Sequence, residues 1–75
     1  MTILSKRLRD LTTKRNFTQK RVAEGSGIPP ETYRRYANGK REPSASLIVA
    51  LADFFNVSTD YLLGRTDNPN MMKGA

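Results

Sequence analysis

Cysteine and histidine are both absent from this sequence of 75 residues. Without cysteine the chain cannot form a disulfide or a thiolate metal site. Without histidine it lacks the usual zinc ligand and the usual proton shuttle at neutral pH. No serine, lysine and carboxylate set is spaced to suggest catalysis either. We therefore expect no metal, no cofactor and no enzymatic activity, and a fold held together by helix packing alone.

Long hydrophobic runs are missing as well. The longest apolar stretch, near Leu47 to Phe55, is much shorter than the roughly 20 residues that span a bilayer. The start of the chain turns basic at Lys6 and Arg7 and lacks the apolar run of a signal peptide. We therefore expect a cytoplasmic protein without a membrane partner, and no small-molecule ligand is evident.

Charge is plentiful but unevenly divided along the chain. Residues 1–41 have a net charge of +8, whereas residues 42–75 have a net charge of −2. This asymmetry indicates a polyanionic partner for the first half, although a basic surface kept for solubility would explain the charge equally well. The basic half contains eleven lysines and arginines: Lys6, Arg7, Arg9, Lys14, Arg15, Lys20, Arg21, Arg34, Arg35, Lys40 and Arg41.

Apolar spacing and capping residues predict an all-α fold of five helices. The first helix covers Ile3–Arg15 and has its leucines on one face. The second follows Thr18, a good N-cap, and stops near Gly25. There Gly25-Ser26-Gly27 can supply the left-handed conformations of a tight turn. The third begins at Pro29-Pro30, because proline fits the first turn of a helix, and ends at Asn38-Gly39.

The last two helices follow a charged loop. The fourth runs from Ser44 or Ala45 to Asn56, and the fifth covers Thr59–Leu63 and is ended by Gly64. We expect one domain over residues 1–64, with residues 65–75 as a flexible tail or linker.

The second and third helices, with the short turn between them, form a predicted helix-turn-helix. In this arrangement one helix crosses the DNA backbone and the next enters the major groove. Ala23 is small where the two helices should approach each other, and Ile28 can anchor the turn in the core.

From Ile3 to about Gly64 the chain resembles the phage repressor and Cro type of helix-turn-helix proteins, also called XRE-type. Order and spacing together make the resemblance specific, and it implies a compact, lambda-repressor-like five-helix domain. The matching segments are Arg7-Leu8-Arg9-Asp10-Leu11, Phe17-Thr18-Gln19, Val22-Ala23, Gly27-Ile28, Asn38-Gly39-Lys40-Arg41-Glu42-Pro43-Ser44 and Asn56-Val57-Ser58-Thr59-Asp60-Tyr61-Leu62-Leu63-Gly64.

The resemblance implies DNA-contacting roles by position. The residues expected to face bases are Gln19, Pro30, Glu31, Arg34 and Arg35. Those expected to hold phosphates are Thr18, Gln19, Asn38, Lys40 and Arg41. For Arg34 and Arg35 the alternative is a solvated helix face, and for Glu31 it is a charge that only complements the helix dipole. Tyr33 and Tyr36 match positions that are apolar in the family, so the resemblance implies that they are half-buried packing residues.

Four residues at three places depart from the family pattern. Ala37 stands where a glutamate usually helps to fix the end of the third helix. Pro30 cannot hydrogen-bond a base edge, so readout there is confined to apolar contact. Gly25-Ser26 replaces a polar and then an apolar residue, and is expected to loosen the turn.

The fourth helix carries a second apolar stripe beside its core stripe. This stripe consists of Leu47, Ala50 and Phe54. Either a monomer tucks Phe54 under the C-terminal helix, or the stripe is a dimer face, which would fit the two-fold symmetry of operator binding.

The leading interpretation is a sequence-specific, double-stranded-DNA-binding transcriptional regulator, expected to be a repressor and a homodimer at least on a two-fold symmetric operator. The alternative is a protein-interaction module of the same fold, such as an antitoxin, which would favour an apolar surface over a basic one. RNA binding is compatible with the charge, but the aromatic signature of an RNA-recognition sheet is absent. The tail after Gly64 resembles a linker, so the N-terminal domain of a longer repressor also remains an alternative.

Overall fold

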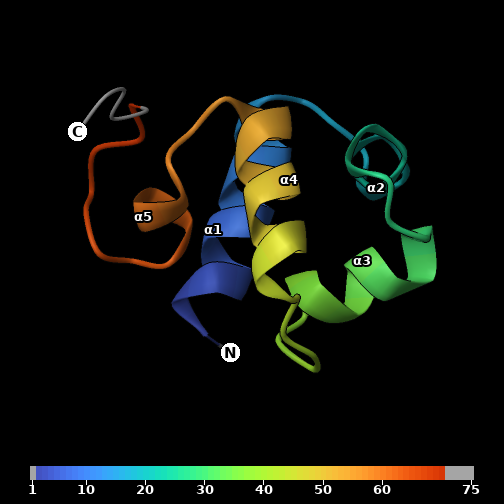
Figure 1. Ribbon diagram of the computed structural model, residues 1–75. Helices are drawn as coiled ribbons and strands as arrows, with labels where there is room; N and C mark the ends of the chain where they lie inside the picture. Colours follow the sequence, from blue (N-terminus) through green and yellow to red (C-terminus); the bar gives the residue numbers. More distant parts are fainter. Residues whose placement is uncertain (1, 71–75) are drawn as a thin grey trace.

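Figure 1 shows the computed structural model, which describes residues 2–70. Within that range the chain forms helices and no strand, and the predicted all-α fold class is confirmed. The helices are α1 (Ile3–Lys14), α2 (Gln19–Ser26), α3 (Pro30–Ala37), α4 (Ala45–Phe55) and α5 (Thr59–Leu62). Helix α4 lies beside α1 at the centre, with α2 and α3 on one side and α5 on the other (Figure 1).

Hydroxyl side chains begin four of these five helices. Each accepts a hydrogen bond from the backbone N–H three residues later, at 3.1 Å for Thr2, 3.0 Å for Thr18, 3.4 Å for Ser44 and 3.0 Å for Ser58. Such a cap satisfies one of the free donors of the first turn. Helix α3 differs, because it begins after Pro29 without a side-chain cap and has proline in its first turn.

The helix ends correct the expected boundaries. Helix α2 continues through Gly25 and Ser26. Of the three residues Gly25-Ser26-Gly27, only Gly27 is left-handed, with φ of 72°. Gly25 therefore does not supply a turn conformation. Helices α1, α4 and α5 each end one residue before the predicted end. The reason at α4 is that Asn56 adopts φ of 57° and terminates the helix.

Each helix contributes apolar side chains to a single core. Leu8, Val22, Tyr33, Leu51 and Phe55 are all fully buried there. The guanidinium of Arg15, just after α1, donates a hydrogen bond to the carbonyl of Phe55 at the end of α4. This bond satisfies the Phe55 carbonyl, which has no hydrogen-bond partner within α4.

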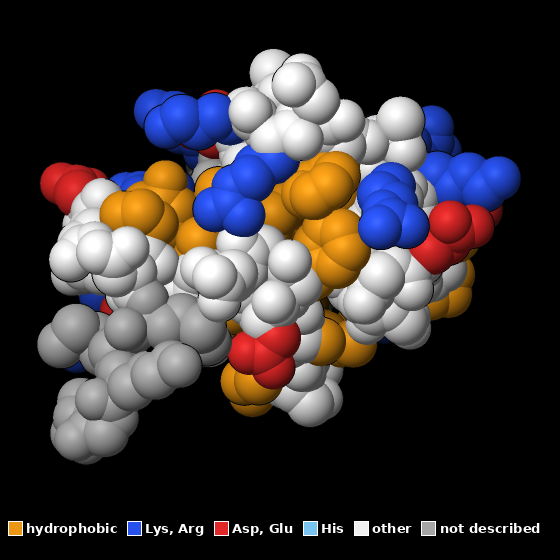
Figure 2. All heavy atoms as spheres, turned by 90° about the horizontal axis from the view of Figure 1, so that it is seen from above, with side chains coloured by type: hydrophobic (Ala, Val, Ile, Leu, Met, Phe, Trp, Pro, Cys, Tyr) orange, Lys and Arg blue, Asp and Glu red, His pale blue; other side chains and the backbone are white. Residues whose placement is uncertain are grey.

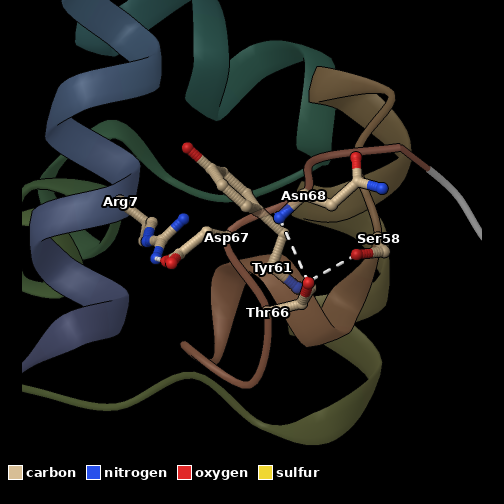
Figure 3. A network of polar contacts seen from close by, with 6 residues as sticks. All are labelled: Arg7, Ser58, Tyr61, Thr66, Asp67 and Asn68. Atoms are coloured by element: carbon tan, nitrogen blue, oxygen red, sulfur yellow. Dashed lines mark hydrogen bonds and ion pairs between the residues drawn. The ribbon is translucent and has the colours of Figure 1, made fainter.

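Residues 65–70, expected to begin the tail, fold back against the domain (Figure 3). Arg7 Nη2 of α1 lies 2.9 Å from a carboxylate oxygen of Asp67, and the guanidinium lies 4.1 Å from the centre of the Tyr61 ring. The N–H of Ser58 donates to the carbonyl of Pro69 at 3.0 Å. The rest of the predicted tail, residues 71–75, lies outside the described residues.

Of the helices in residues 2–70, none has the length and apolar character needed to cross a membrane.

Candidate nucleic-acid interface

Helices α2 and α3 are joined by the three residues Gly27 to Pro29. Ala23 is fully buried and Ile28 is 4% exposed, which confirms their predicted packing roles. The N–H of Ile28 donates to the carbonyl of Ala23 at 2.9 Å, while Gly27 supplies the left-handed residue. This 6→1 bond after a left-handed glycine is the Schellman ending of a helix, and it fixes the direction in which α3 leaves.

The inner face of α3 is anchored in the core. Tyr33 and Tyr36 are 0% and 4% exposed, so they are buried rather than half-buried, and Ala37 is buried beside them. The Tyr33 hydroxyl lies 3.0 Å from the Thr12 hydroxyl, which itself donates to the Leu8 carbonyl at 2.7 Å. Because Thr12 has a single hydrogen to donate, Tyr33 is the donor to Thr12. Burial also raises the pKa of Tyr33, so the hydroxyl stays protonated at neutral pH.

The outer face of α3 presents four of the predicted base-reading residues to solvent: Pro30, Glu31, Arg34 and Arg35. Arg34 Nη2 lies 3.7 Å from Glu31 Oε1, and both side chains are more than half exposed, at 61% and 71%. An exposed pair of this kind adds little stability and separates easily when a partner arrives. Within residues 2–70 Arg35 forms no ion pair, so its guanidinium is available.

The end of α3 brings predicted base-reading and phosphate-binding residues together. A polar cleft there is lined by Arg34, Arg35, Asn38 and Lys40. The backbone positions Lys40, because its N–H donates to the Arg35 carbonyl at 2.9 Å while Gly39 adopts φ of 74°. Two arginines, a lysine and an amide thus converge on one exposed surface, where they can donate hydrogen bonds to an anionic ligand.

The remaining predicted contacts are not among the residues that line this polar cleft. Thr18 and Gln19 are exposed at the start of α2, and Arg41 is exposed in the loop after α3. The Thr18 oxygen accepts from the N–H of Arg21 at 3.0 Å, which leaves the hydroxyl hydrogen free to donate elsewhere. Thr18 can therefore cap α2 and still donate to a phosphate.

Comparisons with known proteins agree with this geometry. The family model described as helix-turn-helix matches residues 6–62. The chain belongs to the helix-turn-helix family. The XRE-type resemblance is thereby confirmed, and the domain is of the DNA-binding kind found in transcriptional regulators.

Three relatives illustrate the family. The HTH-type transcriptional regulators ImmR and AnsR of Bacillus subtilis are 38% and 41% identical over 64 and 59 residues, which are 85% and 79% of this chain. The cryptic phage CTXphi transcriptional repressor RstR of Vibrio cholerae is 34% identical over 55 residues, which are 73% of this chain. These matches cover 50%, 51% and 50% of the relatives, so the chain spans about half the length of the curated relatives it matches.

The second stripe on α4 faces the α2 side of this helix-turn-helix domain. Phe54 is partly buried, and its ring centre lies 5.2 Å from that of Phe17. Leu47 also packs against the core, and Ala50 is partly exposed. Figure 2 looks onto the end of the molecule where α4 finishes and shows hydrophobic side chains uncovered between basic ones. The structure thus places Phe54 against α2, and a dimer contact through this stripe stays a prediction.

The sequence interpretation missed Thr12 as the residue that holds α3 through Tyr33. A signal was present, since Thr12 stands four residues after Leu8 on the apolar face of α1, where a hydroxyl needs a buried partner. The interpretation also missed the contact of Arg7 with Tyr61 and Asp67. Arg7 precedes Tyr61 by 54 positions and Asp67 by 60, so no local pattern connects it to them.

Proposed function

We propose that this domain represses transcription by binding a two-fold symmetric DNA operator as a homodimer, with α3 in the major groove of each half-site. The polar cleft of Arg34, Arg35, Asn38 and Lys40 carries the proposal. It joins the exposed face of the second helix of a helix-turn-helix to the loop that follows it. We expect the domain to bind DNA without catalysing a reaction. A DNA partner is consistent with the cytoplasmic location expected from the sequence.

The contacts divide into two kinds. Arg34 and Arg35 are suited to guanine, because a guanidinium can donate two hydrogen bonds to its O6 and N7 atoms. Glu31 can accept from the amino group of cytosine, and Pro30 can contact a thymine methyl group. Gln19 is proposed to contact an outer base and the phosphate backbone of the DNA. These contacts give sequence specificity.

Thr18, Asn38, Lys40 and Arg41 are proposed to hold phosphates on either side of α3. Contacts of this kind fix the register of the protein on the duplex but carry no sequence information. The net charge of +8 in residues 1–41 supports this assignment, since it attracts a polyanion to the half of the chain that contains α2 and α3.

Selection of bound duplexes from a random pool tests the proposal. We expect enrichment of a two-fold symmetric sequence with guanines in each half, and half-site centres about 34–36 Å apart. Affinity for the selected duplex should fall with salt, with a log–log slope of roughly −4 to −5 if about five phosphates are neutralised. Failure to bind duplex DNA at low salt would overturn the proposal and favour the protein-interaction module. Enrichment of an asymmetric sequence would overturn only the homodimer.

A further inference from the structure

The polar cleft at the end of α3 contains a primary amine that the proposed DNA contacts use only as a charge. This amine belongs to Lys40, which is exposed. Within residues 2–70 its side chain forms no ion pair. A lysine amine is also a nucleophile toward activated acyl groups, and lysine is a common target of acetylation. The cleft therefore holds a reactive group that the proposed function leaves unused.

The two arginines of the polar cleft make it suitable for a small phosphate compound. Among residues 2–70 no carboxylate lines this cleft, and a guanidinium presents paired N–H donors that match the oxygens of a phosphate group. Arg34 is partly engaged, since it lies 3.7 Å from Glu31, whereas Arg35 has no ion pair in the described part of the chain. We therefore expect Arg35 to contribute most to holding the phosphate.

The backbone holds Lys40 beside Arg35. The N–H of Lys40 donates to the Arg35 carbonyl at 2.9 Å, and the left-handed Gly39 turns the chain so that both side chains line one cleft. In an acyl phosphate a single oxygen atom separates the carbonyl carbon from phosphorus. A phosphate held by Arg35 therefore brings an electrophilic carbon close to the Lys40 amine, and proximity of this kind accelerates the reaction between them.

The other lysines among residues 2–70 lack this arrangement. Lys6 lines a cleft together with Arg7, but Asp10 lines the same cleft and repels a phosphate. Lys14 and Lys20 each have an arginine at the next position of the chain, and consecutive side chains of a helix do not face each other. Lys6 is thus the matched internal control for the reactivity of Lys40.

We propose that Lys40 is a site of acylation by small acyl phosphates, with Arg35 holding the phosphate group. The neutral amine of Lys40 attacks the carbonyl carbon, and a C–N bond forms. The bond from that carbon to the bridging oxygen breaks, and inorganic phosphate leaves with the electron pair. The surplus proton of the amine passes to solvent. The product is a neutral amide in place of a positive charge.

Acylation alters the surface that is proposed to bind DNA. The acylated Lys40 has lost its charge, so it no longer attracts a backbone phosphate. Duplex DNA and the acyl phosphate compete for the same arginines and the same lysine. Bound DNA therefore protects Lys40, and acylation in turn weakens DNA binding. This regulatory part rests on the function proposed above, whereas the reactivity of Lys40 does not.

Incubation of the full chain with acetyl phosphate, followed by peptide mass spectrometry, tests the site without DNA. We expect the initial acetylation of Lys40 to be about fivefold faster than that of Lys6, because two unit charges about 4 Å apart in water attract each other by about 1 kcal/mol, which corresponds to that factor. The preference should decline in high salt, which screens exposed charges. Equal initial rates at Lys6 and Lys40 would overturn the site.

A comparison of Arg35→Gln with Arg21→Gln tests the role of the polar cleft. Both arginines are exposed, and neither forms an ion pair within residues 2–70. Arg35→Gln should slow acetylation of Lys40 to the rate at Lys6, and Arg21→Gln should keep the preference. Circular dichroism should show that both variants remain folded. Equal effects of the two variants would show that net charge alone sets the rate and would overturn the assignment of Arg35.

The acyl donor provides a second test of phosphate-directed acylation. In acetyl-CoA a long arm separates the thioester from the phosphates, so a phosphate held by Arg35 does not bring the carbonyl carbon to Lys40. We expect the wild type to show no preference for Lys40 over Lys6 with this donor. The same preference with acetyl-CoA as with acetyl phosphate would overturn the proposed role of the phosphate.

Addition of a selected duplex separates this proposal from the proposed function. Saturating duplex should slow acetylation of Lys40 and leave Lys6 unchanged, and the acetylated protein should bind that duplex as weakly as Lys40→Gln does. If Lys40 is acetylated selectively but the protein binds no duplex, the acylation site stands and the proposed function fails. If the duplex is bound and Lys40 reacts no faster than Lys6, the acylation site fails alone.

Discussion

The ring of Phe54 occupies the space in which a side chain on Gly25 would stand. A Cβ atom built on Gly25 would overlap the ring atoms of Phe54, so the two residues are in direct contact across α2 and α4. Gly25 is helical and does not need glycine for its backbone conformation. The departure from the family pattern at this position therefore serves packing, because it lets an aromatic ring lie against the backbone of α2.

Gly25→Ala should destabilise the domain in spite of the better helix propensity of alanine. The propensity gain is at most about 1 kcal/mol, whereas forcing a methyl group into the ring should cost about 1–3 kcal/mol. Urea unfolding at pH 7 measures the net loss. Combining Gly25→Ala with Phe54→Leu should recover part of it, because a smaller side chain can move aside. A stabilised Gly25→Ala would contradict this packing.

Phe54→Glu should lower the melting temperature of the monomer. The Phe54 ring packs against Phe17 and Gly25, and a carboxylate cannot replace those contacts. We expect a loss of about 2 kcal/mol, below the 3–5 kcal/mol typical of removing a fully buried phenylalanine. Ala50→Glu on the same stripe is the matched control and should melt as the wild type does. If Phe54→Glu is as stable as the wild type but purely monomeric, the stripe is a dimer face.

Tyr33→Phe should reduce the stability of the domain by about 0.5–1.5 kcal/mol, the usual contribution of one hydrogen bond. The effect should also depend on pH. Burial raises the pKa of Tyr33 in the folded protein, so the native state favours the protonated form. The stabilisation is therefore complete below the unfolded pKa of about 10 and is lost as pH rises beyond it.

Denaturant unfolding at pH 8 and pH 11 measures this difference. The wild type should lose more stability over this interval than Tyr33→Phe, because phenylalanine has no proton to release. Tyr61→Phe is a suitable control, since Tyr61 is only partly buried. Equal losses in the wild type and Tyr33→Phe would mean that Tyr33 does not contribute to alkaline unfolding.

Arg35→Ala should weaken binding to the selected operator by about 1–3 kcal/mol and relax selectivity at one base pair in each half-site. Arg35 has no ion pair in the described part of the chain and lies at the polar cleft. Titration of operator and random duplexes with both proteins measures the change. If both duplexes lose affinity equally, Arg35 contacts phosphate and α3 sits in a different register.

Lys40→Ala should instead weaken binding to all duplexes alike. A phosphate contact carries no sequence information, and its loss should reduce the magnitude of the salt slope by about one. Titrations at several salt concentrations give that slope. A selective loss on the operator, with the slope unchanged, would assign Lys40 to a base.

Much of this protein follows from local sequence. The helices are decided by apolar spacing, by hydroxyl N-caps such as Thr18 and by left-handed residues such as Gly27, all of which act within a few positions. The helix-turn-helix follows in the same way, because Ala23 and Ile28 sit beside the turn that they stabilise. The exposure of Arg35 also follows from its position on α3.

Only the tertiary structure decided the contacts between distant segments. Thr12 and Tyr33 are 21 residues apart, and their hydrogen bond depends on how α1 and α3 pack. Gly25 was predicted as a turn residue, because glycine can adopt either a helical or a left-handed turn conformation. The structure shows that Gly25 is helical and that the Phe54 ring of α4 packs against it. The cleft that Ile3 and Leu63 line together is likewise invisible in the sequence. Periodicity reports which face of a helix is apolar, but packing determines which apolar residues the rest of the chain leaves uncovered.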